Sequence, residues 1–212
     1  MIGIFGGTFD PVHYGHIKPA LDVKRALSLT ELRFIPCSIP AHRDEPVATA
    51  AQRLSMLRAA LSEYEGCVID ERELERSGVS YMVDTLQSLR TEFPDEAFCL
   101  IIGMDAFYGL HKWSRWQTLF ELAGCVVTYR PGCELDFDML ADELKILLQS
   151  RQVKTVQEFV DSTNNALLFL PVTQLDISAT DIRKRISKDQ PTNDMLPLMV
   201  KQIIDKQQIY TG

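Results

Sequence analysis

The stretch IGIFGGTFDPVHYGHIKPALDVKRA, residues 2–26, decides the fold. Its apolar start, Ile2–Phe5, predicts a β-strand, and a helical pattern follows from about residue 14. Gly6 and Gly7 stand between them, where glycine allows positive φ and lets a ligand approach the backbone N–H groups. Free N–H groups and the dipole at a helix N-terminus favour negative charge, so this stretch predicts an anion-binding turn.

Apolar runs of this kind alternate with helical patterns along the whole chain. The runs are nearly continuous, which is typical of parallel strands covered on both faces. The alternation predicts an α/β fold with a doubly wound, mainly parallel sheet and helices on both faces, built as a single domain of residues 1–212. The predicted strands are Ile2–Phe5, Leu32–Pro36, Val68–Asp70, Phe98–Ile102, Val126–Tyr129 and Leu167–Leu170. The predicted helices span about 14–28, 50–63, 80–92, 114–122, 136–149, 179–187 and 193–207.

Composition restricts the class of partner. The 212 residues are 46% hydrophobic, which is ordinary for a globular protein. A formal net charge of -7 disfavours nucleic acid as a partner of the whole surface, because duplex binders usually carry basic faces. A small anionic substrate remains compatible with an acidic chain if a local cluster of Arg, His and backbone N–H groups receives it.

Cysteines and apolar runs indicate the compartment. The five cysteines are odd in number and form no CxxC pair, and Cys67, Cys99 and Cys125 lie in apolar runs. We expect these three to be small buried hydrophobic residues of a reducing compartment. No apolar run approaches the roughly 20 residues that span a bilayer, and the first residues lack a signal-peptide pattern. The expected location is the cytoplasm without a membrane partner, and the oligomeric state is not readable.

Two histidines in the first stretch carry its chemistry. His13 and His16 are three residues apart, so on a helix they share a face and can both donate hydrogen bonds to phosphate oxygens. A zinc site would need three or four ligands, and no further pair accompanies these two, so we expect no protein-held metal. The simpler alternative is that His13 caps the helix and His16 packs. For Asp10 we expect a turn-stabilising hydrogen bond.

A second motif, LDISATDIRKRI, stands at residues 175–186. Ser178 is a suitable N-cap, with Asp181 three residues later as in a capping box. The cations Arg183, Lys184 and Arg185 follow, and in the first turns of a helix they would oppose the dipole unless an anion were bound there. Arg183 could hold a phosphate with its planar guanidinium. Two anion sites at two helix N-termini predict one polyphosphate held between them.

The two motifs together resemble the nucleotidylyltransferase superfamily, with its (H/T)xGH and ISxTxxR signatures. The resemblance extends over most of the chain and is closest to the bacterial nicotinate-nucleotide adenylyltransferases, through PAHR (40–43), DERELERSGVSYMVDTL (70–86), IIGMDAFYGLHKW (101–113) and YRPG (129–132). It implies transfer of the adenylyl group of ATP to nicotinate mononucleotide, giving deamido-NAD and pyrophosphate. Mg²⁺ would arrive with the ATP phosphates.

The resemblance also implies roles for individual residues. His13, His16 and Arg183 would be catalytic, and the nicotinate ring would stack on Trp113. The ATP site would comprise Gly6, Gly7, Thr8, Phe9, His16, Gly103, Asp105, Ile177, Ser178 and Arg183. The nicotinate-nucleotide site would comprise Arg43, Thr85, Trp113, Ser114 and Arg130, with His42 as a further phosphate contact.

Three alternatives stay open. The acceptor could be 4′-phosphopantetheine, although that family's chains are typically shorter and lack the WSRW-type segment. It could be nicotinamide mononucleotide, which differs by one functional group. A protein that senses nucleotides without turnover is a different class, although no residue of either signature is missing here.

Overall fold

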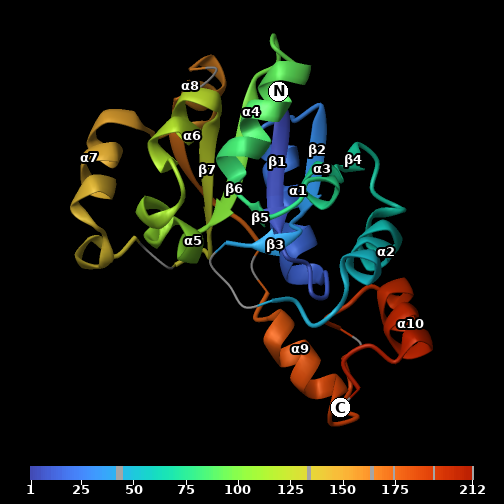
Figure 1. Ribbon diagram of the computed structural model, residues 1–212. Coiled ribbons are helices and arrows are strands. Elements are labelled where there is room, and N and C mark those ends of the chain that lie inside the picture. The colour runs from blue at the N-terminus through green and yellow to red at the C-terminus, as the bar shows by residue number, and fades with distance from the viewer. Residues whose placement is uncertain (42–44, 133–134, 163–164, 174, 193, 212) are drawn as a thin grey trace.

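The computed structural model describes residues 1–212 except 42–44, 133–134, 163–164, 174, 193 and 212 (Figure 1). Its centre is a seven-stranded sheet in the order β4-β2-β1-β6-β7-β9-β8, and every strand pair is parallel. A short two-stranded sheet pairs β3 with β5. The strands are β1 (Ile2–Gly7), β2 (Glu31–Pro36), β3 (Ile39–Pro40), β4 (Cys67–Ile69), β5 (Val79–Ser80), β6 (Phe98–Gly103), β7 (Gly124–Tyr129), β8 (Gln152–Val153) and β9 (Leu167–Pro171).

The strand order confirms the predicted doubly wound sheet. Winding proceeds from β1 outward to β2 and β4, then returns to β6 and continues to β7 and β9. The direction reverses between β1 and β6, and in such sheets ligands bind outside the carboxyl ends of the strands at this point. Pairing between the two strands ends at Ile4 and Leu100, so the carboxyl-terminal halves of β1 and β6 separate. The fold therefore leaves a binding position beside Gly7 and Gly103.

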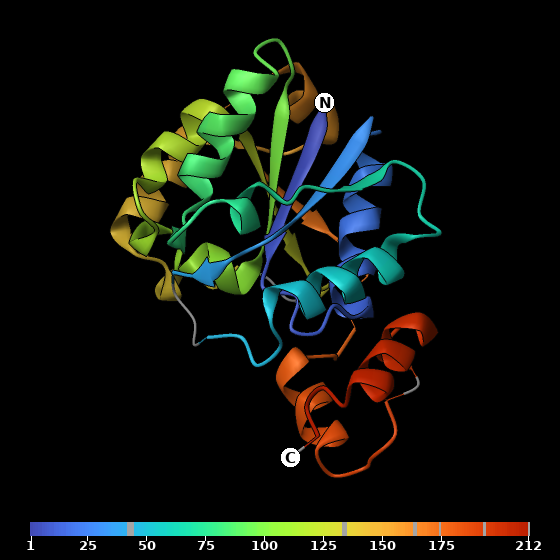
Figure 2. The same cartoon turned by 45° about the vertical axis from the view of Figure 1, so that its right-hand side comes forward.

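Helices cover both faces of the sheet, as Figures 1 and 2 show. Side chains of α1, α2, α8, α9 and α10 join one core cluster, and those of α4, α5, α6 and α7 join the other. Successive residues of β6 point to alternate faces, and both sets are apolar, which explains the continuous apolar runs in the sequence. The helices are α1 (Tyr14–Ala26), α2 (Ala50–Leu61), α3 (Arg72–Glu75), α4 (Met82–Glu92), α5 (Met104–Tyr108), α6 (Trp116–Leu122), α7 (Asp142–Arg151), α8 (Val156–Asp161), α9 (Ala179–Ile186) and α10 (Leu198–Gln207), with 3₁₀ turns η1 (Leu110–Lys112) and η2 (Phe137–Met139).

The structure corrects some of the predicted elements. The helix expected over 136–149 divides into η2 and α7, and the one expected from 193 begins at Leu198. Strands β3, β5 and β8 have two residues each, and helix α3 has four, so none of them carries a readable period. Cys99 and Cys125 are buried as predicted, whereas Cys67 is half-buried.

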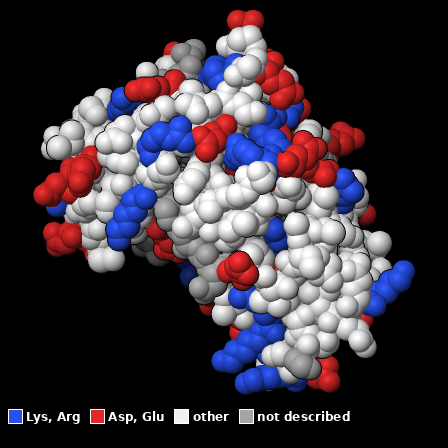
Figure 3. Space-filling view, viewed as in Figure 1, with Lys and Arg blue, Asp and Glu red and all other residues white. Residues whose placement is uncertain are grey.

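Surface charge is mixed on the face shown in Figure 3. Acidic and basic side chains are interspersed over its upper part, uncharged residues cover much of the centre and lower right, and lysine and arginine gather at the lower end near α9. In the described part of the chain, no helix is both long and apolar enough to cross a membrane.

Candidate active site

The loop from β1 to α1 forms the first wall of the site. Phe9 takes a positive φ of 51° and is buried, and its ring lies edge-on to the His16 ring at 5.3 Å between centroids. The peptide bond between Asp10 and Pro11 is cis. This loop places Thr8 and the start of α1 at the carboxyl end of β1.

Gly6 and Gly7 stand at closely packed positions, not in a backbone conformation that only glycine adopts. Both belong to strand β1, and neither has the positive φ that the sequence suggested. A Cβ at Gly6 would lie 2.5 Å from Met82 Cε, and one at Gly7 would lie 2.8 Å from the Phe9 ring. The positive φ that glycine would allow in this loop lies at Phe9 instead.

The two histidines stack on one another at the start of α1. Their ring centroids are 3.7 Å apart, with 25° between the planes. His16 Nδ1 accepts a hydrogen bond from the backbone N–H of His13 at 3.3 Å. In a neutral His16 ring the proton therefore resides on Nε2, which can donate to a ligand.

His13 is the more deeply placed of the two. Its side chain is only 4% exposed, and Nδ1 has no hydrogen-bond partner in the described structure. Burial lowers the pKa of His13 from 6.5 to about 4, so the ring is neutral near pH 7. An anion bound nearby would offset that burial by favouring the protonated ring.

Gly15 brings the second motif against the first. A Cβ at this position would lie 2.9 Å from His13 Nδ1 and 3.2 Å from the carbonyl oxygen of Ile177. Ile177 directly precedes Ser178, the N-cap of α9, whose Oγ accepts from the Asp181 N–H at 3.1 Å. The two predicted anion sites therefore adjoin, although Gly15 and Ile177 are 162 residues apart in the sequence.

Arg183 joins the two motifs directly. Its Nη1 donates to the backbone oxygen of Asp10 at 2.8 Å and lies 3.7 Å from the Asp10 carboxylate. One sequence argument fails here: α9 has only eight residues, so Arg183, Lys184 and Arg185 lie in its last turn, where cations match the helix dipole. Arg183 is a candidate anion ligand because it contacts the loop of residues 8–13 between β1 and α1, called the phosphate loop below, and not because it opposes a helix dipole.

The remaining predicted residues surround the carboxyl ends of the strands. Gly103 ends β6 and precedes α5, and a Cβ added there would meet nothing within 4 Å. Asp105 is exposed in the first turn of α5, and Arg130 is exposed directly after β7. Trp113 and Ser114 are half-buried in the segment between η1 and α6. His42 and Arg43 lie outside the described residues.

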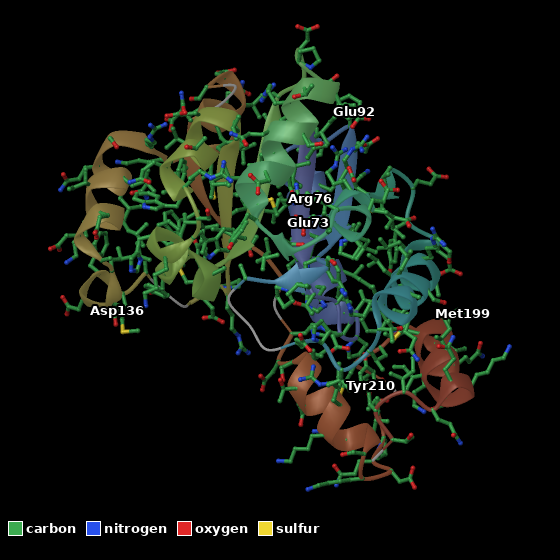
Figure 4. The ribbon with its side chains drawn as sticks, viewed as in Figure 1. Glu73, Arg76, Glu92, Asp136, Met199 and Tyr210 are labelled. Atoms are coloured by element: carbon green, nitrogen blue, oxygen red, sulfur yellow. The ribbon has the colours of Figure 1, made fainter. Side chains whose placement is uncertain are left out.

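Thr85 is placed differently from what a direct ligand contact would require. It is fully buried, its hydroxyl donates to Glu73 Oε1 at 2.6 Å, and Thr85 Oγ1 itself accepts from Arg76 Nη2 at 3.2 Å. Figure 4 labels Glu73 and Arg76 together in front of the sheet. Burial raises the pKa of Glu73. The single hydroxyl proton is already used, so the place of Thr85 in the nicotinate-nucleotide site stays a prediction.

Sequence reasoning missed Arg53. Only 1% of it is exposed, and it donates to the backbone oxygens of Thr8 at 2.8 Å and Ser38 at 3.3 Å. It thereby ties the phosphate loop to the segment after β2. One signal could have revealed it: Arg53 falls in register with Met56, Leu57 and Ala60 on the buried face of α2.

Metal ligation is not built into the described residues. Within the described ranges, no group of three or more His, Cys, Asp or Glu side chains could hold an ion. The site instead offers ring N–H groups, a guanidinium, a hydroxyl and helix N-termini, all of which suit phosphate oxygens.

The reversal point of the sheet, the stacked histidines and the adjoining Arg183 motif define a nucleotidylyltransferase. A family model described as cytidylyltransferase-like matches residues 4–185. A "Probable nicotinate-nucleotide adenylyltransferase" of Methylococcus capsulatus is 46% identical over 99% of both chains, and one of Halorhodospira halophila is 44% identical over 95% of this chain and 91% of its own. The chain belongs to the cytidylyltransferase-like family and, within it, to the nicotinate-nucleotide adenylyltransferases.

Solved structures agree on the fold. The nicotinic acid mononucleotide adenylyltransferase of Plasmodium falciparum complexed with NaAD aligns with a TM-score of 0.72, over 99% of this chain and 96% of that chain. At 17% identity this likeness supports the fold alone.

Proposed function

We propose that this protein transfers the adenylyl group of ATP to nicotinate mononucleotide, releasing pyrophosphate and forming deamido-NAD. It does so as one nucleotidylyltransferase domain. The observation that carries the proposal is the contact of the two signature motifs, in which Arg183 Nη1 reaches the Asp10 backbone oxygen at 2.8 Å. That contact holds the guanidinium at the loop that leads into the two histidines, and we assign the polyphosphate to this place.

The reaction requires positioning more than covalent catalysis. A phosphate oxygen of nicotinate mononucleotide attacks the α-phosphorus of ATP in line. A new P–O bond forms while the bond from the α-phosphorus to the bridging oxygen breaks, and pyrophosphate carries away that electron pair. The mononucleotide phosphate is already a nucleophile near pH 7, so no general base is needed. Holding two anions together against their repulsion is the principal task.

The site residues divide this task. His16 donates from Nε2 to the oxygens on which charge develops, and His13 supports it as the stacked partner. Arg183 and Ser178 hold the β- and γ-phosphates with Thr8, while Gly6 and Gly7 admit the nucleotide. Gly103 and Asp105 receive the adenosine. Mg²⁺ enters as Mg-ATP and keeps most of its water.

The pyridine side is assigned to the segment after η1. Trp113 is the ring on which the nicotinate stacks, and the Ser114 N–H meets its carboxylate. Asp84 forms an ion pair with Arg115, which fixes the start of α4 against this segment. Arg43 and Arg130 are proposed for the mononucleotide phosphate.

Pyrophosphate release from Mg-ATP tests the proposal. Three acceptors are compared at equal concentration: nicotinate mononucleotide, nicotinamide mononucleotide and 4′-phosphopantetheine. We expect the first to give the highest kcat/KM. A preference for either of the others would reassign the acceptor, and ATP binding without turnover of any would indicate a sensing protein.

A further inference from the structure

Asp10 is the most connected side chain of the phosphate loop, although the reaction gives it no role. It is 5% exposed, and its two carboxylate oxygens accept from the N–H groups of Val47 at 2.8 Å and Ala48 at 3.0 Å. These bonds reach across 37 and 38 residues to the segment before α2. The turn-stabilising hydrogen bond expected from the sequence is therefore replaced by long-range contacts.

The far end of the chain supplies a third donor. The hydroxyl of Tyr210 donates to Asp10 Oδ1 at 2.7 Å, over 200 residues of sequence. Tyr210 is 8% exposed, and Figure 4 labels it between α9 and α10. Burial and the neighbouring Asp10 carboxylate raise the pKa of Tyr210 far above its usual range, so the hydroxyl keeps its proton for this bond.

The end of the chain also touches the loop elsewhere. The backbone N–H of Tyr14 donates to the Met195 oxygen at 3.0 Å, and α10 packs against α2. Ile209 and Tyr210 belong to the same core cluster as Phe9 and Val12. The last residues are therefore part of the wall behind the phosphate loop.

Arg183 depends on this arrangement. Its guanidinium contacts Asp10 twice, at the backbone oxygen and at Oδ2, and its side chain remains 28% exposed. Packing alone therefore does not hold the Arg183 guanidinium in place. The orientation of the Asp10 carboxylate, set by Val47, Ala48 and Tyr210, determines where one contact of Arg183 lies.

We propose that Tyr210 is a positioning residue of the polyphosphate site, acting through Asp10 on Arg183 without touching a substrate. Loss of its hydroxyl leaves Asp10 Oδ1 with one donor fewer and releases the side of the carboxylate opposite Arg183. The guanidinium then samples positions away from the phosphates. This inference rests on the proposed assignment of ATP to the site, and it assigns the chain end a part in nucleotide affinity.

Tyr210→Phe tests the inference, because it removes one oxygen and keeps the ring. Calorimetric titration with Mg-ATP alone should give a Kd at least about fivefold higher than that of the wild type, in line with a hydrogen bond to a charged group. The KM for nicotinate mononucleotide should change less than twofold. Tyr64→Phe is the matched control, since its ring packs against the same core cluster and its Kd should equal that of the wild type.

A double-mutant cycle tests the route through Asp10. If Tyr210 acts through this carboxylate, Tyr210→Phe should add less than twofold to the Kd of Asp10→Asn. Tyr64→Phe should combine with Asp10→Asn multiplicatively. Penalties of Tyr210→Phe and Asp10→Asn that multiply in full would overturn the inference, as would an unchanged Kd in Tyr210→Phe.

The two proposals fail in different experiments. Titration with Mg-ATP requires no second substrate, so it reports on Tyr210 even if nicotinate mononucleotide is not the acceptor. A wild type that binds Mg-ATP but does not use nicotinate mononucleotide contradicts the proposed reaction alone. A Tyr210→Phe variant that merely unfolds more easily, with both substrate constants unchanged, contradicts the positioning role alone.

Discussion

At the scale of the residue, the contact with His13 decides which ring nitrogen of His16 can donate a hydrogen bond. Because Nδ1 accepts from the His13 N–H, the neutral ring presents its proton at Nε2. His16→Ala should lower kcat at least about 100-fold, since a preorganised donor to developing charge is lost. The Kd for Mg-ATP should change little. Lys18→Ala, exposed on the same helix, is the control and should retain full activity; full activity in His16→Ala would remove His16 from the reaction.

His13 makes stability depend on pH. Burial lowers its pKa from 6.5 to about 4, so between these values the unfolded chain binds a proton that the folded chain does not. The free energy of unfolding should therefore fall as pH drops from about 6.5 toward 4, with a His13 contribution of at most about 1.4 kcal/mol per pH unit, and this contribution is absent above 6.5. In His13→Gln the slope should be smaller by that amount. Urea unfolding at pH 7, 6 and 5 measures it, and identical slopes in both proteins would contradict it.

The sequence contained the local part of the site. Spacing alone predicted the histidine pair and the Ser178 cap, because those contacts lie within a few residues. The partners of Asp10 and Arg53 could not be predicted, since they lie 15 to 200 residues away and no period in the sequence encodes them. The missing information is tertiary contact rather than residue type.

At the scale of the element, the proposed function gives the N-cap of α9 a phosphate-binding role in addition to capping. Ser178→Ala should lower the free energy of unfolding by about 1 kcal/mol, as loss of an N-cap usually does. It should also raise the KM for Mg-ATP several-fold. Thr155→Ala removes the corresponding cap of α8, whose Oγ1 accepts from the Glu158 N–H at 3.2 Å. That control should lose similar stability with an unchanged KM, whereas equal KM values in both variants would limit Ser178 to capping.

Element length decided which elements were predictable. The six strands of three or more residues make up the central sheet except for its edge strand β8, and all six were predicted. The pair β3 and β5 escaped because two residues show no alternation. That pair is nevertheless linked to the loop after β1, since Ser38 donates to Ser80 Oγ at 3.0 Å and accepts from Arg53, which also contacts Thr8.

At the scale of the whole molecule, ligand binding should stabilise the fold. Mg-ATP contacts the folded chain only, so at 100 times its Kd it should raise the free energy of unfolding by about 2.7 kcal/mol. Arg183→Ala should lose most of this gain at the same nucleotide concentration. Lys184→Ala, the adjacent exposed cation, should retain it. Thermal unfolding with and without Mg-ATP measures the difference, and an equal gain in both variants would exclude Arg183 from the nucleotide site.

The contact between Asp10 and Arg183 also sets an order of events during synthesis. It spans 173 residues, whereas β1 pairs with β2 within about 30. Closing the longer loop costs more chain entropy, and the arginine leaves the ribosome long after the first strands. A nascent chain can therefore build much of its sheet while it still lacks a complete polyphosphate site. In refolding, recovery of sheet signal should accordingly precede recovery of nucleotide binding.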